Sequence, residues 1–262
     1  MTVRGQPTKP LPAGARMPVL GLGVWQLPAG PATEQAVEWA LEDGYRLVDT
    51  ATMYRNEQSV GAALARSGLP REELFVTTKL YPTHPNAAPE LAKSLDRLGL
   101  DYVDLYLIHW PVPLMNVRHW RQLEELQTRG LARDIGVSNY SVGQLENLRR
   151  HDLKTPAVNQ VHFSPFRHSL ELVEYCNKNS IVVEAYSPLE QGKGLKDPTI
   201  VGIASTLGRT PAQVMLRWAI QHGTVVIPKS ANRERIRSNA QVFDFALDED
   251  TMQALDRLER HA

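Results

Sequence analysis

The chain has 262 residues, of which 42% are hydrophobic and 22% charged, with 29 basic and 29 acidic side chains. This length predicts one domain, residues 1–262, with a single large core. The balanced charge excludes a global field that would draw the protein to nucleic acid or to an anionic membrane. No run approaches the roughly 18 consecutive apolar residues of a membrane span, and no signal-peptide apolar core follows the basic N-terminus.

The single cysteine, Cys176, lies in Leu-Val-Glu-Tyr-Cys, a run typical of the apolar side of a helix. We interpret it as core packing. One thiol cannot form an internal disulfide, and no Cys/His cluster has the spacing of a zinc site. We therefore expect a metal-free, cytoplasmic protein, and we expect a monomer.

Short β-rich runs alternate with segments of helical period, after a hairpin predicted over residues 10–18. The eight predicted strands cover residues 19–24, 46–48, 74–78, 103–108, 134–137, 157–161, 181–185 and 224–227. The predicted helices cover residues 34–42, 57–66, 89–98, 120–129, 142–149, 170–179, 211–222 and 233–240, with an extra terminal helix over 248–260. Eight βα pairs in about 250 residues favour an α/β fold of the (β/α)8 TIM-barrel type over an open doubly wound sheet.

The glycines after the first strand test the open-sheet alternative. A dinucleotide-binding open sheet needs G-x-G-x-x-G between its first strand and first helix. The sequence Gly21-Leu-Gly23-Val-Trp-Gln contains only two of these three glycines. The pattern therefore favours the barrel.

Titratable side chains follow three neighbouring predicted strands. Asp49, Lys79 and His109 come at the ends of the second, third and fourth strands, and Tyr54 follows five residues after Asp49. Singly, such residues are most often a loop cap, a surface lysine, a core histidine and a half-buried aromatic. In a barrel, however, the C-terminal ends of strands converge on one mouth, and a desolvated lysine needs the counter-charge that Asp49 offers. The four residues together predict a catalytic cluster.

Seven ordered motifs around these residues resemble the signatures of the aldo-keto reductases. They are Asp49-Thr-Ala-Thr-Met-Tyr54-Arg-Asn-Glu57, Thr-Thr-Lys79, Leu-Ile-His109-Trp110-Pro111, Ile-Gly-Val-Ser138-Asn139, Val-Asn-Gln160, Ala-Tyr186-Ser187-Pro188-Leu189 and Ile-Pro-Lys229-Ser230. The resemblance runs from about residue 19 to residue 239. Within the family, the sequence is most similar to the short bacterial 2,5-diketo-D-gluconate reductases, a subgroup suggested by residues 190–197.

The resemblance implies an NADPH-dependent oxidoreductase that reduces small aldehydes, ketones or α-dicarbonyls, such as 2,5-diketo-D-gluconate or methylglyoxal, to alcohols. It implies a tetrad of Asp49, Tyr54, Lys79 and His109, with Tyr54 as general acid. An ammonium beside a phenol favours the phenolate, so we expect Lys79 to lower the pKa of Tyr54 toward the working range. We expect His109 to be neutral and to orient the carbonyl oxygen.

The resemblance also implies contacts along a bound cofactor. The residues expected at the cofactor are Ser138, Asn139 and Gln160 on the carboxamide, Tyr186 on the nicotinamide ring, Ser187 and Leu189 on the pyrophosphate, Lys229, Ser230 and Arg235 on the 2′-phosphate, and Asn239 on the adenine. The residues expected to face the substrate are Trp25, Met53, His109 and Trp110. Two positions depart from the family pattern: His162 stands where Glu is common, and Ser238 where many members have an acidic residue. Arg233 and Arg237 are interpreted as a solvated helix face.

Two other functions stay open at this point. One is an NADPH-binding regulatory protein on the same barrel with little turnover, because a fold does not guarantee activity. The other is a lyase or isomerase acting on sugar phosphates, for which Lys229 and Ser230 could bind the phosphate. Within the reductase interpretation, the short segment 111–117 and the chain end at residue 262 leave little cover over the mouth, which predicts compact substrates.

Overall fold

The computed structural model describes residues 5–81 and 83–259. Its main sheet is parallel, with the strand order β10-β9-β8-β7-β6-β5-β4-β3. These strands are β3 (Gly21–Gly23), β4 (Leu47–Asp49), β5 (Phe75–Leu80), β6 (Val103–Ile108), β7 (Ala132–Ser138), β8 (Val158–His162), β9 (Val182–Tyr186) and β10 (Val225–Val226). A parallel bridge between Leu20 and Val226 joins the first strand to the last. The predicted (β/α)8 barrel is confirmed, and the open sheet is wrong.

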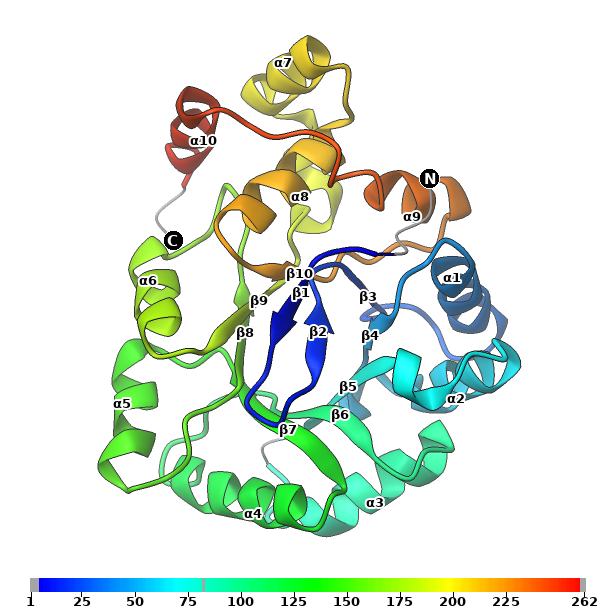
Figure 1. Ribbon diagram of the computed structural model, residues 1–262, viewed down its shortest axis with the longest axis vertical. Coiled ribbons are helices and arrows are strands. Elements are labelled where there is room, and N and C mark those ends of the chain that lie inside the picture. Colours follow the sequence, from blue (N-terminus) through cyan, green and yellow to red (C-terminus); the bar gives the residue numbers. More distant parts are fainter. Residues whose placement is uncertain (1–4, 82, 260–262) are drawn as a thin grey trace.

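Helices surround the barrel (Figure 1). They are α1 (Pro31–Glu42), α2 (Glu57–Arg66), α3 (Ala87–Leu98), α4 (Asn116–Thr128), α5 (Val142–Arg150), α6 (Leu170–Lys178), α7 (Pro198–Leu207), α8 (Pro211–Gln221), α9 (Arg233–Asn239) and α10 (Glu249–Asp256). Short 3-10 turns lie at η1 (Thr52–Tyr54), η2 (Arg71–Glu73) and η3 (Glu190–Lys196). Helix α8 begins where the sequence predicts it, because the Thr210 hydroxyl accepts from the backbone N–H of Gln213 and Pro211 occupies the first turn.

Three helices differ most from the sequence prediction. Helix α7 was not predicted, because its β-branched residues and Gly202 have weak helix propensity; Asp197 nevertheless caps it by accepting from the N–H of Thr199 at 3.0 Å. Helix α4 begins at Asn116 rather than at residue 120. Helix α10 ends at Asp256, short of the predicted residue 260, which lies outside the described residues.

A hairpin of β1 (Thr8–Pro10) and β2 (Arg16–Pro18) covers one end of the barrel (Figure 1). Met17 and Leu11 pack against Leu47 and Phe75, the first residues of β4 and β5. The hairpin tip is tied down by the N–H of Ala13, which donates to Asp134 Oδ1 at 3.1 Å. The hairpin therefore closes the N-terminal end of the barrel and leaves the C-terminal end for a site.

The larger part of the core lies between the barrel and its helices, where Trp120, Trp218 and Cys176 are fully buried. Cys176 thus packs as predicted, and burial raises the pKa of its thiol to about 11. Within the described ranges, no helix is both long enough and apolar enough to cross a membrane.

Candidate active site

A cavity of about 870 Å³ opens at the C-terminal ends of the strands. Every site residue predicted from the sequence lines it except Lys79. The predicted residues along its wall are Trp25, Asp49, Met53, Tyr54, His109, Trp110, Ser138, Asn139, Gln160, Tyr186, Ser187, Leu189, Lys229, Ser230, Arg235 and Asn239. Lys79 is fully buried behind this wall, in contact with Asp49 and Tyr54.

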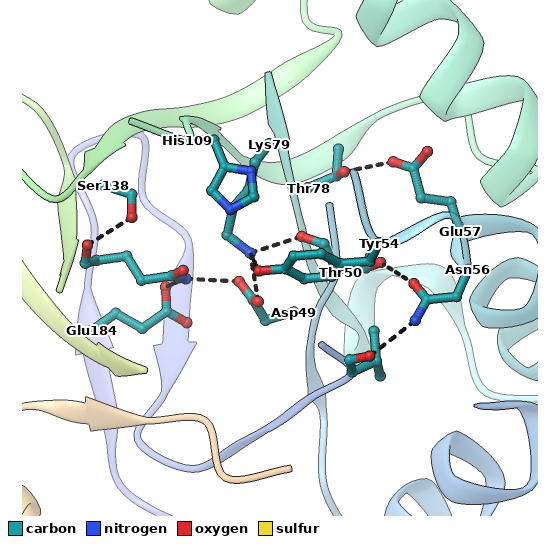
Figure 2. A network of polar contacts seen from close by, with 12 residues as sticks. Asp49, Thr50, Tyr54, Asn56, Glu57, Thr78, Lys79, His109, Ser138 and Glu184 are labelled. Carbon is teal, nitrogen blue, oxygen red and sulfur yellow. Dashed lines mark hydrogen bonds and ion pairs between the residues drawn. The ribbon is translucent and has the colours of Figure 1, made fainter. Parts of the chain in front are cut away.

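The hydrogen bonds of a buried asparagine fix the turn that carries Tyr54. Tyr54 ends the 3-10 turn η1, and Arg55 follows it in the left-handed region with φ 58°. The Thr50 hydroxyl donates to Asn56 Oδ1 at 2.9 Å, while Asn56 Nδ2 donates to the carbonyl oxygen of Val24 at 2.9 Å (Figure 2). Asn56 is fully buried, and these two partners directly follow β4 and β3. These bonds therefore anchor the turn to the ends of both strands.

On the outer side of β5, a second buried group supports the same region. Thr78 Oγ1 donates to Glu57 Oε1 at 2.6 Å, and Arg97 Nη2 forms an ion pair with Glu57 Oε2 at 2.6 Å. The carboxylate of Glu57 is therefore paired although it is buried, as such groups must be. Sequence reasoning assigned no role to Asn56 or Glu57, because neither residue type nor spacing reveals which strand each one contacts.

The ammonium of Lys79 is the centre of the cluster (Figure 2). Its Nζ donates to Asp49 Oδ1 at 2.6 Å, to the carbonyl oxygen of Thr50 at 2.8 Å and to Tyr54 Oη at 3.3 Å. These three acceptors match the three hydrogens of an ammonium. Burial lowers the pKa of Lys79, but the charge of Asp49 and the other contacts raise it, with a net rise. Lys79 therefore stays charged inside the barrel.

Tyr54 differs from the sequence prediction in its acidity. Burial raises the pKa of Tyr54 above its ordinary value, and the charge of Lys79 lowers it by less than burial raises it. The expected net lowering is therefore wrong, because the phenolate would lose its hydration on burial. Tyr54 consequently keeps its proton through neutral pH and is able to donate it.

His109 faces the same cavity as Tyr54, and the two rings meet edge to face with their centroids 5.6 Å apart. Burial lowers the pKa of His109 to about 3, and the nearby charge of Lys79 acts in the same direction. An imidazole with this pKa is neutral, so it carries one N–H donor. A carbonyl oxygen between Tyr54 and His109 could accept from both.

The residues predicted at the nicotinamide form a hydrogen-bonded chain beside the tetrad. Tyr186 Oη donates to Asn139 Oδ1 at 2.9 Å, and Asn139 Nδ2 donates to Ser138 Oγ at 2.9 Å. Ser138 Oγ in turn donates to the backbone oxygen of Gln160 at 2.8 Å. The side chain of Gln160 donates from Nε2 to Asp49 Oδ2 at 2.8 Å, so it connects this chain to the tetrad.

The cationic groups predicted for a 2′-phosphate line the same cavity. Lys229 and Arg235 line the cavity, and no ion pair holds either of them among the described side chains. Arg233 and Arg237 instead pair with acidic residues of the α1 region, at 2.7 Å and 3.1 Å. The structure thus separates Arg235 from the two flanking arginines, as the sequence interpretation did.

The two departures from the family pattern both lie on the cavity wall. His162 Nε2 lies 3.3 Å from Glu190 Oε1, the oxygen that also accepts from the Ser164 hydroxyl at 2.5 Å. Burial lowers the pKa of His162, while the charge of Glu190 opposes this effect. The family pattern has a Glu at position 162 on β8. Here Glu190 of η3 places a carboxyl group beside that position instead. Ser238 lines the cavity next to Asn239, the residue predicted to contact an adenine.

One buried acid near the tetrad was missed by sequence reasoning. Glu184 is fully buried at the middle of β9, and its Oε2 accepts from Gln160 Nε2 at 2.7 Å. Burial and the charge of Asp49 raise the pKa of Glu184 to about 8. An acidic residue inside the apolar run Val-Val-Glu-Ala was the signal that could have revealed it.

Three large apolar side chains form a partly exposed rim of the cavity. Trp25, Met53 and Trp110 are 40%, 47% and 46% exposed, which is high for large hydrophobic side chains. All three also line the cavity. Partly exposed apolar side chains beside convergent polar groups are typical of a pocket for a small organic ligand.

Comparison with known proteins gives the family. The model of the aldo/keto reductase family matches residues 19–260, and the chain belongs to this family. It is 50% identical over 248 residues to an aldo-keto reductase of Mycolicibacterium vanbaalenii, covering 93% of this chain and 88% of that protein. It is 44% identical over 250 residues to the glyoxal reductase of Bacillus subtilis, covering 94% and 91%.

Solved structures agree with this assignment. The aldose reductase of Schistosoma japonicum superposes with a TM-score of 0.91 at 36% identity, covering 97% of this chain and 93% of that one. The protein is therefore an oxidoreductase of the carbonyl-reducing class on a (β/α)8 barrel. None of these matches distinguishes a 2,5-diketo-D-gluconate reductase from other members.

We expect the imidazole of His109 to stay neutral from about pH 8 down to about pH 5, because its pKa is lowered to about 3 and it gains a proton only below that value. Imidazole ¹⁵N chemical shifts measured across this range would check it, with the His109→Gln variant identifying the signal. A His109 signal that titrates near the ordinary pKa of about 6.5 would contradict the effect assigned to burial.

Proposed function

We propose that this protein reduces small aldehydes, ketones or α-dicarbonyls to alcohols with NADPH, using Tyr54 as the general acid. The observation that carries the proposal is the contact of the Lys79 ammonium with Tyr54 Oη at 3.3 Å, at the wall of a cavity large enough for a dinucleotide and a small substrate. The names of the relatives support it, since one is a glyoxal reductase and another an aldose reductase.

The groups that line the cavity match the chemistry of NADPH. Amide and hydroxyl groups of Gln160, Asn139 and Ser138 lie at the tetrad, where a carboxamide would bind, and the Tyr186 ring offers an aromatic surface for the nicotinamide. Ser187 and Leu189 line the same cavity, and we assign them to the pyrophosphate; Lys229, Ser230 and Arg235, which also line it, are assigned to the 2′-phosphate, and Asn239 to the adenine. When bound, NADPH supplies a hydride from C4 of its nicotinamide ring.

The residues of the tetrad manage the proton that carbonyl reduction requires. Because burial keeps Tyr54 protonated, its O–H is available to protonate the carbonyl oxygen as the carbon accepts a hydride. The phenolate left on Tyr54 then lies beside the Lys79 ammonium. This attraction develops with the charge, so it stabilises the transition state more than the ground state. Asp49 holds Lys79 in place, and neutral His109 orients the oxygen.

The rim residues favour compact substrates. Trp25, Met53 and Trp110 are large apolar side chains of the cavity wall, and each is 40% or more exposed. A rim that is this open buries little of a large ligand, so it offers little binding energy for one. We therefore propose α-dicarbonyls such as methylglyoxal, or keto-sugar acids such as 2,5-diketo-D-gluconate, as the substrate class. Cytoplasmic location, a monomeric state, a single domain and independence of metals stay predictions.

The Tyr54→Phe variant tests the proposed chemistry. We expect it to bind NADPH normally and to lose about 10² to 10⁴ in kcat on an aldehyde, because a positioned acid contributes about that much. Steady-state kinetics and fluorescence titration with NADPH would measure both quantities. Near-normal kcat in this variant would contradict the role of Tyr54, and an unmodified protein that binds NADPH without turnover would instead support a regulatory protein.

The Arg235→Ala variant tests the cofactor. We expect NADPH affinity to fall about ten- to a hundredfold, because the guanidinium would lose a charge-assisted bond to the 2′-phosphate, while NADH affinity changes little. The matched control is Arg233→Ala, which removes an arginine from the same helix whose side chain pairs with Glu42. Equal losses for both cofactors, or equal losses in both variants, would contradict the assignment.

A substrate panel tests the proposed size limit. We expect measurable kcat/KM on methylglyoxal and other small dicarbonyls with high KM, and little activity on ketosteroids, because the open rim contacts only a small part of a large ligand. The loss of NADPH absorbance would be followed for each compound. A higher kcat/KM for a ketosteroid than for every small dicarbonyl would overturn the substrate class.

A further inference from the structure

The side chain of Asn56 does not play the role that its place in the chain would favour. Asn56 is the N-cap residue of α2, where an asparagine side chain commonly accepts from a backbone N–H of the first helical turn. Here the side chain makes no such capping bond within the described part of the chain, and it is fully buried. A buried amide needs partners, so the hydrogen bonds that replace the cap indicate what this residue does.

Both N–H groups and the oxygen of this amide bind other segments of the chain. Its Nδ2 donates to the carbonyl oxygen of Val24 at 2.9 Å and to that of Leu27 at 3.1 Å. Its Oδ1 accepts from the Thr50 hydroxyl at 2.9 Å (Figure 2). Turning the amide over would place its oxygen against two carbonyl oxygens, which is unfavourable. The side chain therefore joins the segment from Val24 to Leu27 to the loop that carries Tyr54.

This segment is a tight turn whose two corner residues line the cavity. The N–H of Leu27 donates to the oxygen of Val24 at 3.0 Å, which closes the turn. Its corner residues are Trp25 and Gln26, and both line the cavity. Gln26 has a φ of 63°, in the left-handed region that residues with a Cβ seldom adopt. Such a conformation persists only where the surrounding contacts fix it.

The two ends of the turn are held by different contacts. At its first residue, the N–H of Val24 also donates to the backbone oxygen of Asp49 at 3.1 Å, so the turn begins beside the tetrad. At its last residue, the carbonyl oxygen of Leu27 accepts from Asn56. Removing the amide would therefore leave the first end attached and free the last. Trp25 lies between these two ends, so its place on the cavity wall depends on both.

We propose that Asn56 is a positioning residue that fixes Trp25 relative to Tyr54, and that it thereby sets how strongly the site prefers a carbonyl compound with an apolar substituent. The indole of Trp25 is partly exposed on the cavity wall, so its own packing does not fix it fully. An aromatic wall favours one substrate over another only when it stays in place relative to the reacting group. The inference rests on the proposed function, in which Trp25 faces the substrate.

The test compares two α-dicarbonyls that share a reacting group, methylglyoxal and phenylglyoxal, with NADPH as cofactor. The quantity to measure is the ratio of kcat/KM for phenylglyoxal to kcat/KM for methylglyoxal. Effects on Tyr54 or on cofactor binding that are common to both substrates cancel in this ratio. We expect Asn56→Leu, which has a similar volume and no donor, to lower the ratio about two- to tenfold, the effect of one aromatic contact. The loss should appear mainly as a higher KM for phenylglyoxal.

Two control variants separate this role from general support of the fold. Thr50→Val removes only the hydrogen bond on the Tyr54 side of the amide, so it should leave the ratio unchanged even if it lowers kcat on both substrates. Trp25→Ala should lower the ratio by itself. Adding Asn56→Leu to Trp25→Ala should lower it no further, because both residues act through one contact with the substrate.

An unchanged ratio in Asn56→Leu would overturn the proposal. An equal fall in Thr50→Val, or a further fall when Asn56→Leu is added to Trp25→Ala, would overturn it as well. If Asn56→Leu does not fold, Asn56→Asp must lower the ratio, because a carboxyl group has at most one hydrogen to donate and leaves one of the two carbonyl oxygens without its donor. An unmodified protein that reduces neither compound with NADPH would refute the proposed function itself, and this inference with it.

Discussion

The site depends on one buried ammonium. Lys79 is fully buried, and a charge in that position destabilises the fold by several kcal/mol unless it is paired and hydrogen-bonded. Asp49 supplies the opposite charge at 2.6 Å, while Thr50 and Tyr54 accept the two remaining hydrogens. Folding therefore brings the tyrosine, the lysine and the aspartate together before any ligand binds, and the same contacts that satisfy the lysine place a positive charge beside the proposed proton donor.

From this ammonium a continuous set of hydrogen bonds extends to the cofactor side of the cavity. Asp49 uses one carboxylate oxygen for Lys79 and the other for Gln160, and Gln160 reaches Glu184 with its second hydrogen. Groups in one buried network reinforce one another, and the low polarity of the surroundings makes each unsatisfied member costly. The proposed proton donor and the proposed carboxamide subsite thus belong to one hydrogen-bonded network rather than to two independent sites.

The sequence predicted this arrangement well where chain direction alone decides it. Parallel strands end at the same rim of a barrel, so Asp49, Lys79 and His109 had to meet once the eight strands were recognised. The sequence prediction failed where a pKa depends on burial or where a contact depends on a partner far along the chain. The sequence correctly predicted the cation of Lys79 beside Tyr54, but burial raises the pKa of Tyr54 by more than this cation lowers it. The apolar run around Glu184 marks a buried acid, but its partner Gln160 lies on another strand, so no local pattern identifies that contact.

The central claim is that Asp49 and Lys79 act as one unit on Tyr54, and a double-mutant cycle tests it most directly. The quantity to measure is kcat/KM on a small aldehyde for Asp49→Asn, Lys79→Met and the double variant. Residues that act as a unit give non-additive losses. The kcat/KM of the double variant should therefore lie within about threefold of that of the less active single variant. Losses that multiply, with the double variant reduced by the product of the two single effects, would contradict the account.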